Sequence, residues 1–201
     1  MKENQLEDYC LYLDKINQKL DKFFEEQKPY IFCKEGCAYC CQEGEYPCTE
    51  LEFSLLKIGF DRIEDEIKEI VIEKTKKLKE EKMKNPDEVL TCECPFLVNN
   101  KCSAYIYRPI ICRTFGVAYF DSNERLKVPF CHELGLNYSN VYDKETKMIS
   151  EEKYQATGIE QKPLAYNLSQ KFLIKEVGEN GMGLDFGERK TITDWMIETI
   201  E

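Results

Sequence analysis

The sequence predicts a mainly α-helical protein with small β-hairpins and irregular cysteine-rich loops wrapped around a metal site. Three observations support this fold class. Apolar residues recur every three or four positions in several segments, which is the period of an amphipathic helix. Short β-type runs separated by turn residues occupy the middle of the chain. The cysteines gather in two clusters, at 33–48 and at 92–112.

The first expected element is an amphipathic helix over residues 3–27. Pro29 prevents its continuation, because proline lacks the amide donor that a helix interior needs. Residues 1–29 therefore form an N-terminal helix in the predicted domain organisation. Cys10 lies beside the apolar stripe of this helix and is expected to be a buried thiol.

A loop over residues 30–48 follows, interrupted by glycine and proline. The run Thr49-Glu50-Leu51-Glu52 then has the pattern of a capping box, in which the threonine and the second glutamate each accept the other's backbone amide. It predicts a helix over 50–58 that Gly59 closes. A further helix is expected over 61–83, with a narrow apolar stripe and a solvated face rich in lysine and glutamate.

Residues 89–107 are expected to form two short strands joined by a tight turn. Asn99-Asn100 suits that turn, because asparagine tolerates the positive φ that a two-residue hairpin loop requires. Cys94 and Cys102 would then lie near the two ends of one hairpin.

The remaining elements are predicted with weaker patterns. Residues 108–116 suggest a short helix or turn, and residues 117–130 suggest a second hairpin. Helices are expected over 162–176 and 192–200, with a glycine-rich loop over 178–188 between them.

The charge balance restricts the classes of partner. The chain carries 38 acidic and 28 basic residues, a net charge of −10. This excess argues against nucleic acid and against an anionic membrane surface as partners, since both need a basic face. No apolar run approaches the ~20 residues of a membrane span, and the first residues lack the apolar core of a secretory signal. A cytoplasmic location is expected.

The cysteines are the unusual feature of the composition. A reducing compartment keeps thiols reduced, so clustered cysteines there bind metal or carry out redox chemistry. The single histidine, His132, argues against sites built on several histidines. Cys37 and Cys40 form a two-residue knuckle, which Cys33 and Cys41 extend. A hairpin and a turn would bring Cys94, Cys102 and Cys112 to the same place.

The count of thiols leaves the metal open. Structural zinc takes four ligands, so seven or more cysteines fit either two zinc sites or an iron–sulfur cluster with cysteines left over. Further candidate ligands are Cys131, His132, Cys48 and Cys92. Bases within the motif could offset thiolate charge, and aromatic residues could exclude water from the site. These bases are Lys34, Lys101, Arg108 and Arg113, and these aromatic residues are Tyr39, Tyr105, Phe115 and Tyr119.

Together the motif blocks resemble a known family. They are Cys33-Lys-Glu-Gly-Cys37-Ala-Tyr-Cys40-Cys41, Cys94-Pro-Phe-Leu97, Cys102-Ser-Ala-Tyr105, Arg108-Pro109 and Cys112-Arg-Thr-Phe-Gly116. Their order and spacing are similar to those of the CxxCxxCC cysteine-cluster family, a YkgJ-like zinc- or iron-chelating domain related to the cluster region of flagellin lysine-N-methylases. The gap after Cys33 is three residues here instead of two. The resemblance implies a bound metal or cluster.

The resemblance also suggests a domain organisation. A CxxCxxCC-type metal-binding domain would span 30–135, with inserted helices over 50–84. A C-terminal helical extension over 136–201 would pack on it. The predicted ligands, taken from the spacing and the resemblance together, are Cys33, Cys37, Cys40, Cys41, Cys94, Cys102, Cys112 and Cys131.

These features favour a cytoplasmic protein that holds an iron–sulfur cluster or zinc through thiolates, with a structural or electron-transfer role and room for a protein partner. One alternative is a metal-dependent protein-modifying enzyme of the methyl-transfer type, or its accessory. A second is a thiol redox protein that uses Cys37 and Cys40. A secreted disulfide-bonded domain conflicts with the missing signal. No catalytic constellation is evident, and the acids near the motif read as solvated surface. These acids are Glu43, Glu45, Asp121 and Glu133.

Overall fold

The computed structural model describes residues 3–34, 36–84, 91–121 and 123–201. The chain folds into two compact units. The first unit comprises Met1–Leu6, Gly36–Cys112 and Asp185–Glu201, and the second comprises Glu7–Glu35 and Arg113–Leu184. Helices make up about 54% of the described residues and strands about 11%. The predicted mainly α-helical class with small strand pairs is therefore confirmed.

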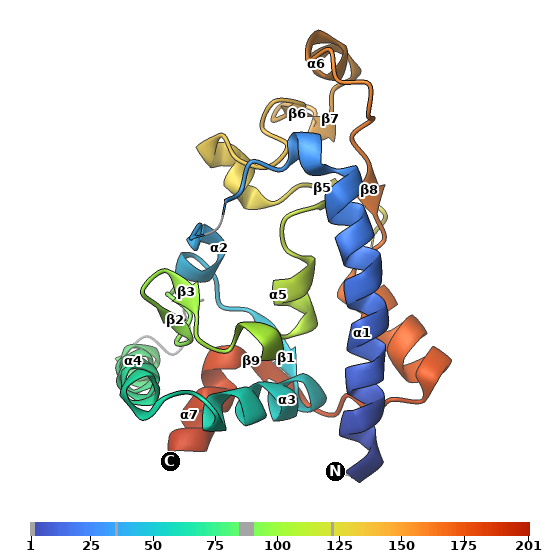
Figure 1. Cartoon of the computed structure of the whole chain (residues 1–201). Coiled ribbons are helices and arrows are strands. Elements are labelled where there is room, and N and C mark those ends of the chain that lie inside the picture. The colour runs from blue at the N-terminus through green and yellow to red at the C-terminus, as the bar shows by residue number, and fades with distance from the viewer. Residues whose placement is uncertain (1–2, 35, 85–90, 122) are drawn as a thin grey trace. The chain divides into compact units, whose positions relative to one another are not determined.

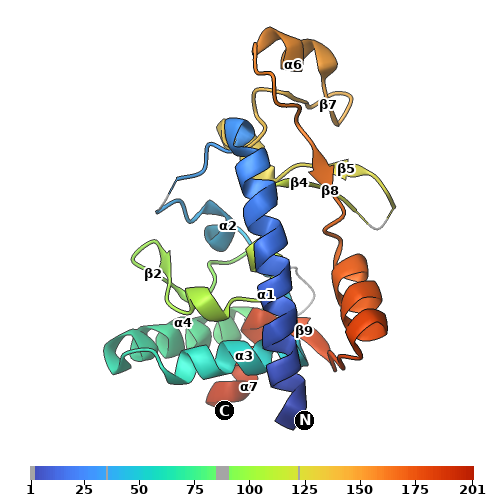
Figure 2. The same ribbon diagram turned by 45° about the vertical axis from the view of Figure 1, so that its right-hand side comes forward.

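Three helices and one pair of strands frame the first unit (Figures 1 and 2). The helices are α3 (Glu50–Asp61), α4 (Asp65–Lys84) and α7 (Ile192–Ile200). The strands β1 (Pro47–Thr49) and β9 (Arg189–Thr191) pair antiparallel, with the first residue of β1 opposite the last of β9. Because β1 leads into α3, β9 leads into α7 and the strands are antiparallel, the two helices begin at opposite ends of this short ladder.

Each of these strands ends in a threonine that caps the helix after it. The Thr49 hydroxyl accepts the Glu52 amide, and the Glu52 carboxylate accepts the Thr49 amide at 2.8 Å, which confirms the predicted capping box. The Thr191 hydroxyl accepts the Asp194 amide at 3.0 Å in the same way. Both caps satisfy amides that have no partner within the helix.

The cysteine-bearing part of the first unit is built from short elements. These are α2 (Tyr39–Gln42), the hairpin β2 (Leu97–Val98) and β3 (Lys101–Cys102), the 3₁₀ turn η2 (Tyr105–Tyr107), and α5 (Ile110–Thr114), whose residues from Arg113 onward belong to the second unit. Asn99 and Asn100 link the two strands with φ angles of 51° and 58°. The predicted hairpin turn is thus confirmed, although residues 89 and 90 of the predicted segment lie outside the described residues.

An apolar core holds the first unit together. It joins α3, α4 and α7 to the hairpin and includes Cys48, Phe53, Leu56, Phe60, Val71, Phe96, Ala104, Ile192 and Met196. Phe60 meets Phe96 edge-on with ring centroids 6.2 Å apart, which packs the hairpin against α3. Phe53 stacks on Trp195 at 5.4 Å, which packs α7 against α3. Such pairs stabilise beyond their buried area by about 0.5–1.5 kcal/mol.

The second unit combines most of the long helix α1 (Glu3–Glu26), from Glu7 onward, with a small sheet and short turns (Figure 1). Its sheet has the order β5-β4-β8, in which β4 pairs antiparallel with β5 and parallel with β8. The pairing of β4 with β5 confirms the predicted second hairpin. The remaining bounds are η1 (Lys28–Tyr30), β4 (Ala118–Phe120), β5 (Leu126–Lys127), η3 (Phe130–Leu134), β6 (Tyr142–Asp143), β7 (Met148–Ile149), α6 (Glu151–Ala156), β8 (Ala165–Tyr166) and the π-helix η4 (Lys171–Asn180).

Two predictions about helices in the second unit are wrong. The helix expected over 162–176 is replaced by β8 and by the beginning of η4, which extends into the expected loop. The backbone is extended here because β8 pairs with β4 and because the buried Gln27 side chain binds the Leu164 amide and the Lys162 carbonyl. Cys10 is exposed and not buried, since the buried face of α1 follows Tyr9, Tyr12 and Leu13.

In the first unit, Gly59 has another role than the predicted one. Helix α3 continues past it to Asp61. A Cβ atom at position 59 would come within 2.6 Å of the Tyr107 ring, so glycine allows η2 to pack against α3. The helix expected from 61 begins instead at Asp65. Among the helices of the described ranges, none combines the length and apolar character needed to cross a bilayer.

This packing yields a prediction for Gly59→Ala. Alanine favours a helix by about 1 kcal/mol over glycine, yet its methyl group would overlap the Tyr107 ring and its Cβ atom. We expect the free energy of unfolding to fall by about 1–3 kcal/mol, as for other overpacked sites. Urea denaturation measures it, with Lys57→Ala on the same helix as the control. A Gly59→Ala protein as stable as the wild type would show that the contact is not tight.

Candidate functional site

Five cysteines from three separate segments of the first unit meet in one place. Cys40 and Cys41 lie in α2, Cys94 lies three residues before strand β2 of the hairpin, Cys102 ends strand β3, and Cys112 lies in α5. All five carry free thiols. We call them the thiol cluster. The predicted convergence of distant cysteines is therefore present for these five.

A backbone hydrogen bond joins the two cysteine segments directly. The Cys94 amide donates to the Cys41 carbonyl at 2.7 Å. The thiols themselves also interact. Cys94, Cys102 and Cys40 lie near enough to Cys112 to raise its pKa. Cys40 in turn forms a side-chain hydrogen bond with Cys41. Each of the five thiols therefore interacts with at least one other member of the cluster.

Two cysteines of the hairpin receive amide hydrogen bonds on sulfur. The Phe96 amide donates to the Cys94 thiol, and the Ala104 amide donates to the Cys102 thiol. In both cases the donor lies two residues after the cysteine, where the chain turns back over the sulfur. Such bonds stabilise a thiolate and are one means by which proteins tune metal–sulfur centres.

Burial opposes ionisation of the cluster. It raises the pKa of Cys94 to about 12, against the opposing bond from the Phe96 amide. It also raises the pKa of Cys102 and of Cys112, and neighbouring thiols raise the latter further. For Cys40 the hydrogen bond with Cys41 is the largest cause of a raised pKa, followed by burial. These raised pKa values favour the protonated thiol at Cys40, Cys94, Cys102 and Cys112 when nothing else is bound.

A buried carboxylate fixes the helix that carries Cys112. Glu52 is 1% exposed and accepts the Ile110 amide at 2.9 Å, in addition to its bonds with Thr49. It therefore links the beginning of α3 to the beginning of α5. Burial raises the pKa of Glu52, while the hydrogen bonds from Thr49 and Ile110 lower it. The capping box signalled this residue, but its contact with Ile110 could not be read from the sequence.

Positive charge near the cluster comes from the predicted base Arg108 and from Lys74, which lowers the pKa of Cys94. The Arg108 guanidinium lies over the Tyr105 ring, 3.6 Å from its centroid, and lowers the pKa of Cys102. Lys34 and Lys101 are exposed, and Arg113 belongs to the second unit, where it donates to Asn17 at 3.1 Å. Arg108 thus matches its predicted role more closely than the other bases.

Tyr46 is a site residue that sequence analysis missed. Its hydroxyl donates to the Cys40 carbonyl at 2.5 Å. Burial raises its pKa, as do the nearby thiols of Cys40, Cys112, Cys41 and Cys94. Its position between the two cysteines Cys41 and Cys48 was the available signal, but tyrosines are too frequent in this chain for the position alone to stand out.

Three of the eight predicted ligands lie outside the thiol cluster. Cys37 is exposed in the first unit. Cys33 and Cys131 belong to the second unit. There the Cys33 amide donates to the buried Asn137 side chain at 2.9 Å, and Cys131 is buried in η3. Their role as ligands stays a prediction, and His132 beside them packs edge-on against Tyr142.

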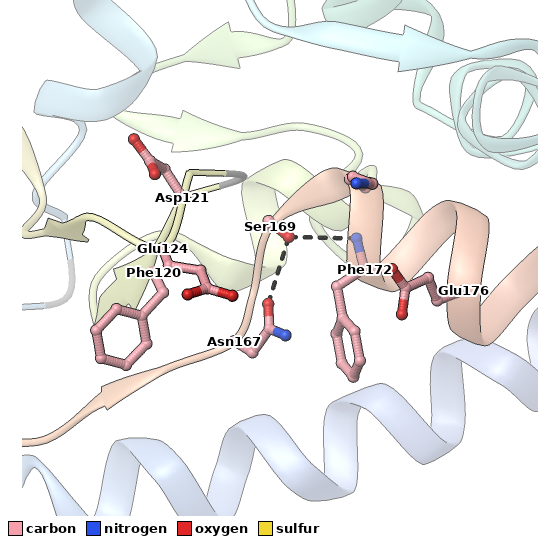
Figure 3. Close-up of a pocket in the computed structure, with 8 residues that line it drawn as sticks. Phe120, Asp121, Glu124, Asn167, Ser169, Phe172 and Glu176 are labelled. Carbon is pink, nitrogen blue, oxygen red and sulfur yellow. Dashed lines mark hydrogen bonds between the residues drawn. The ribbon is translucent and has the colours of Figure 1, made fainter.

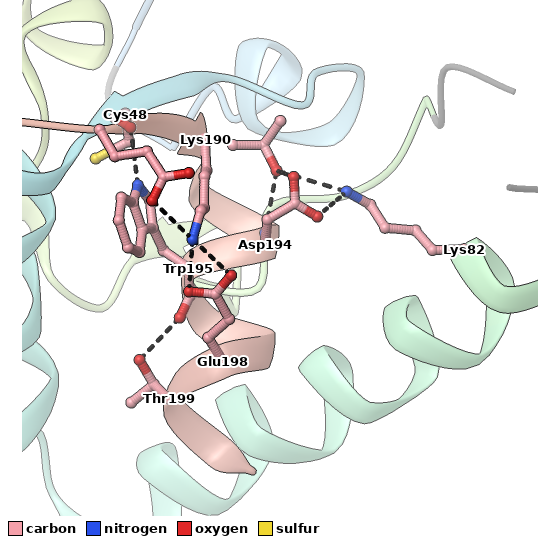
Figure 4. Close-up of polar contacts among 9 residues, drawn as sticks. Cys48, Lys82, Lys190, Asp194, Trp195, Glu198 and Thr199 are labelled. Atoms are coloured by element: carbon pink, nitrogen blue, oxygen red, sulfur yellow. Dashed lines mark hydrogen bonds and ion pairs between the residues drawn. The ribbon is translucent and has the colours of Figure 1, made fainter. Parts of the chain in front are cut away.

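Cys48 and Cys92 also lie in the first unit, and Figure 4 shows Cys48 beside Trp195 of α7. The Cys48 carbonyl accepts the Trp195 indole N–H at 2.8 Å, and its thiol interacts with Glu52 and Cys112. The Cys92 thiol bonds to Thr193. Both cysteines are therefore tied to the start of α7.

The aromatic residues expected to exclude water, and the acids near the motif, are distributed over both units. Tyr39 is partly buried and Tyr105 is exposed in the first unit, while Phe115 and Tyr119 belong to the second. Glu45 is paired with Lys82, which also binds Asp194 at 2.6 Å (Figure 4). Asp121 and Glu133 lie in the second unit, where Asp121 is paired with Arg125 at 3.1 Å.

A cavity of about 470 Å³ lies in the second unit (Figure 3). It is lined by Phe120, Asp121, Glu124, Asn167, Ser169, Lys171, Phe172 and Glu176. The Ser169 hydroxyl donates to Asn167 and accepts the Phe172 amide, so these polar groups are satisfied within the unit. The cavity involves none of the cysteines.

The thiol cluster is not arranged as a closed metal site. Within the residues that the structure describes, no group of three or more His, Cys, Asp or Glu side chains has a geometry that could hold a metal ion. Comparisons of the chain with protein-family models, with curated proteins and with solved structures find no match. The resemblance to the CxxCxxCC family therefore stays a prediction from the motif residues.

The contacts of Glu52 predict a loss of stability in Glu52→Gln. The glutamine amide group would face the donors of Thr49 and Ile110, leaving at least one buried donor without an acceptor. We expect unfolding to require about 1–3 kcal/mol less free energy, measured by urea denaturation. Glu50→Gln, at an exposed acid in the same first turn of α3, is the control. Equal effects of the two substitutions would argue against a bridging role for Glu52.

Proposed function

We propose that the first unit binds a thiolate-ligated metal centre, an iron–sulfur cluster or zinc, with a structural or electron-transfer role. The meeting of five thiols from three chain segments is the observation that carries this proposal. Their donor chemistry fits such a centre, because soft metals select thiolate ligands. When bound, zinc would supply a structural cross-link, and an iron–sulfur cluster would supply one-electron transfer.

The surroundings of the cluster support this proposal in a second way. Gathering several partly buried thiols serves no packing purpose that larger apolar side chains would not serve better. Yet amides are directed at Cys94 and Cys102, and Arg108 acts on Cys102. These groups favour thiolates, so they oppose the effect of burial on the pKa. A metal that displaces the thiol protons would resolve this opposition.

Each chain segment has a distinct part in this proposal. The Cys94 amide bond to Cys41 holds the hairpin against α2, and Glu52 holds α5 in place for Cys112. Loading requires the sulfur atoms to close further by side-chain rotation, because the described geometry is open. Cys37, three residues before Cys40, is a further proposed ligand, and Cys33 and Cys131 stay in the predicted set.

The thiol redox alternative is less well supported. A nucleophilic thiol needs a lowered pKa, whereas the hydrogen bond with Cys41 and burial raise the pKa of Cys40. The methyl-transfer alternative depends on the resemblance alone. We therefore propose metal binding first.

Elemental analysis of anaerobically purified protein tests the proposal. We expect stoichiometric zinc, or iron with sulfide and a broad visible absorbance band. Cys112→Ser should reduce the metal content strongly and lower the thermal stability of the loaded protein, since ligand binding energy contributes to folding. Cys10→Ser, at an exposed cysteine of the second unit, is the control. Wild-type metal content in Cys112→Ser would exclude the thiol cluster as the site.

The raised thiol pKa values predict how pH affects the metal-free protein. Thiols of the unfolded chain ionise near pH 9.0, whereas the folded Cys94 has a pKa of about 12. The folded state therefore binds protons more tightly, and its stability declines as pH rises from about 9 towards 12. Between about pH 8 and pH 10 we expect a loss of about 1 kcal/mol from Cys94, and a further loss in the same direction from Cys40, Cys102 and Cys112, whose pKa values are also raised.

Urea unfolding of reduced, chelator-treated protein at the two pH values measures this loss. Cys112→Ser should show a smaller decline, because it has one buried thiol fewer. The loaded protein should not show the decline, since its ligands are already ionised. A metal-free protein with equal stability at both pH values would contradict the assigned burial of the cluster.

A further inference from the structure

Tyr46 is held in place at both its backbone and its side chain. It lies between α2 and β1, and its carbonyl accepts the Ile192 amide, the first of α7, at 2.9 Å. Its hydroxyl reaches back to α2 and donates to the Cys40 carbonyl at 2.5 Å. The side chain therefore spans from the framework of the first unit to the turn that carries Cys40 and Cys41.

The ring of Tyr46 lies against Gly44. A Cβ atom at position 44 would come within 2.4–2.6 Å of the ring and its hydroxyl. The φ angle of Gly44 is not positive, so its backbone does not need glycine. The close approach of the Tyr46 ring is the described reason for glycine at this position.

The hydroxyl of Tyr46 also lies among the cluster thiols. It interacts electrostatically with Cys40, Cys112, Cys41 and Cys94, which are four of the five members. Helix α2 has a single turn, so its carbonyls depend on groups outside the helix for hydrogen bonds. Tyr46 supplies the one for Cys40.

We propose that Tyr46 is a positioning residue that holds the Cys40–Cys41 turn against the other thiols and covers the cluster against solvent, with Gly44 leaving the space for its ring. This role deepens the proposed function and rests on it for its effect on a bound metal. Its effect on thiol exposure, however, exists in the metal-free protein as well. The two ideas can therefore be tested separately.

The first test is alkylation of the reduced, metal-free protein by iodoacetamide, with each cysteine followed by mass spectrometry. Tyr46→Phe removes only the hydroxyl, and we expect Cys40 and Cys41 to react about fivefold faster, the change that loss of one hydrogen bond produces in a local opening equilibrium. Gly44→Ala should act in the same direction by displacing the ring. Cys48 and Cys92, tied to the start of α7, should keep their rates.

Tyr107→Phe is the matched control. Its hydroxyl donor partner is Arg62, at 2.9 Å in the same unit, and no cluster thiol. A merely structural role of Tyr46 would accelerate all buried thiols together, and this uniform change would overturn the proposal. If Cys40 and Cys41 react no faster in Tyr46→Phe than in Tyr107→Phe, the proposal would also be overturned.

The second test is the rate at which a chelator removes metal from the loaded protein. We expect Tyr46→Phe and Gly44→Ala to lose metal faster than wild type and Tyr107→Phe, and equal rates would overturn the effect on the bound metal. A wild-type protein that holds no metal would overturn the proposed function. The alkylation rates would still decide the role of Tyr46, so the two failures are distinguishable.

Discussion

The structure of the candidate site depends on one backbone hydrogen bond, from the Cys94 amide to the Cys41 carbonyl. The whole of α3 and α4 separates these two residues in the chain, and closing so long a loop costs conformational entropy. The apolar core of the first unit offsets that cost by packing the hairpin on α3 through Phe60 and Phe96. Once the hairpin is docked, the bond holds the Cys94 segment beside α2, which carries Cys40 and Cys41.

Much of the fold could be predicted because its signals are local. The capping box at Thr49 and the Asn99-Asn100 turn are short patterns with one physical explanation each, and both are present. The role of Gly59 could not be predicted, because a glycine that ends a helix and a glycine that admits a neighbouring ring look alike in sequence. The helix predicted over 162–176 is absent because pairing with β4 and the hydrogen bonds of Gln27 outweigh the helical spacing of its apolar residues.

The sequence indicated that cysteines would form the candidate site, but not which of the cysteines would lie there. Spacing identified the cysteines, but it could not assign Cys33 to the second unit, where Asn137 binds its amide. The supporting residues were harder still. Glu52 has a visible local role as a cap, while its second role depends on Ile110, which only tertiary contacts bring to it. Tyr46 depends in the same way on the position of α7.

The electrostatics of the cluster connect its architecture to the proposed function. Four thiolates in a buried place would be strongly unfavourable, and the raised pKa of Cys94 and Cys112 expresses that cost. The protonated cluster avoids the cost but leaves the amides of Phe96 and Ala104 directed at neutral sulfur, where their bonds are weak. A cationic centre would change both the cost of ionisation and the strength of these hydrogen bonds. It would compensate the thiolate charge, and the amide hydrogen bonds to ionised sulfur would be stronger. Under the proposed function, the arrangement of donors around the sulfur atoms would therefore suit an ionised, metal-bound form better than the protonated one.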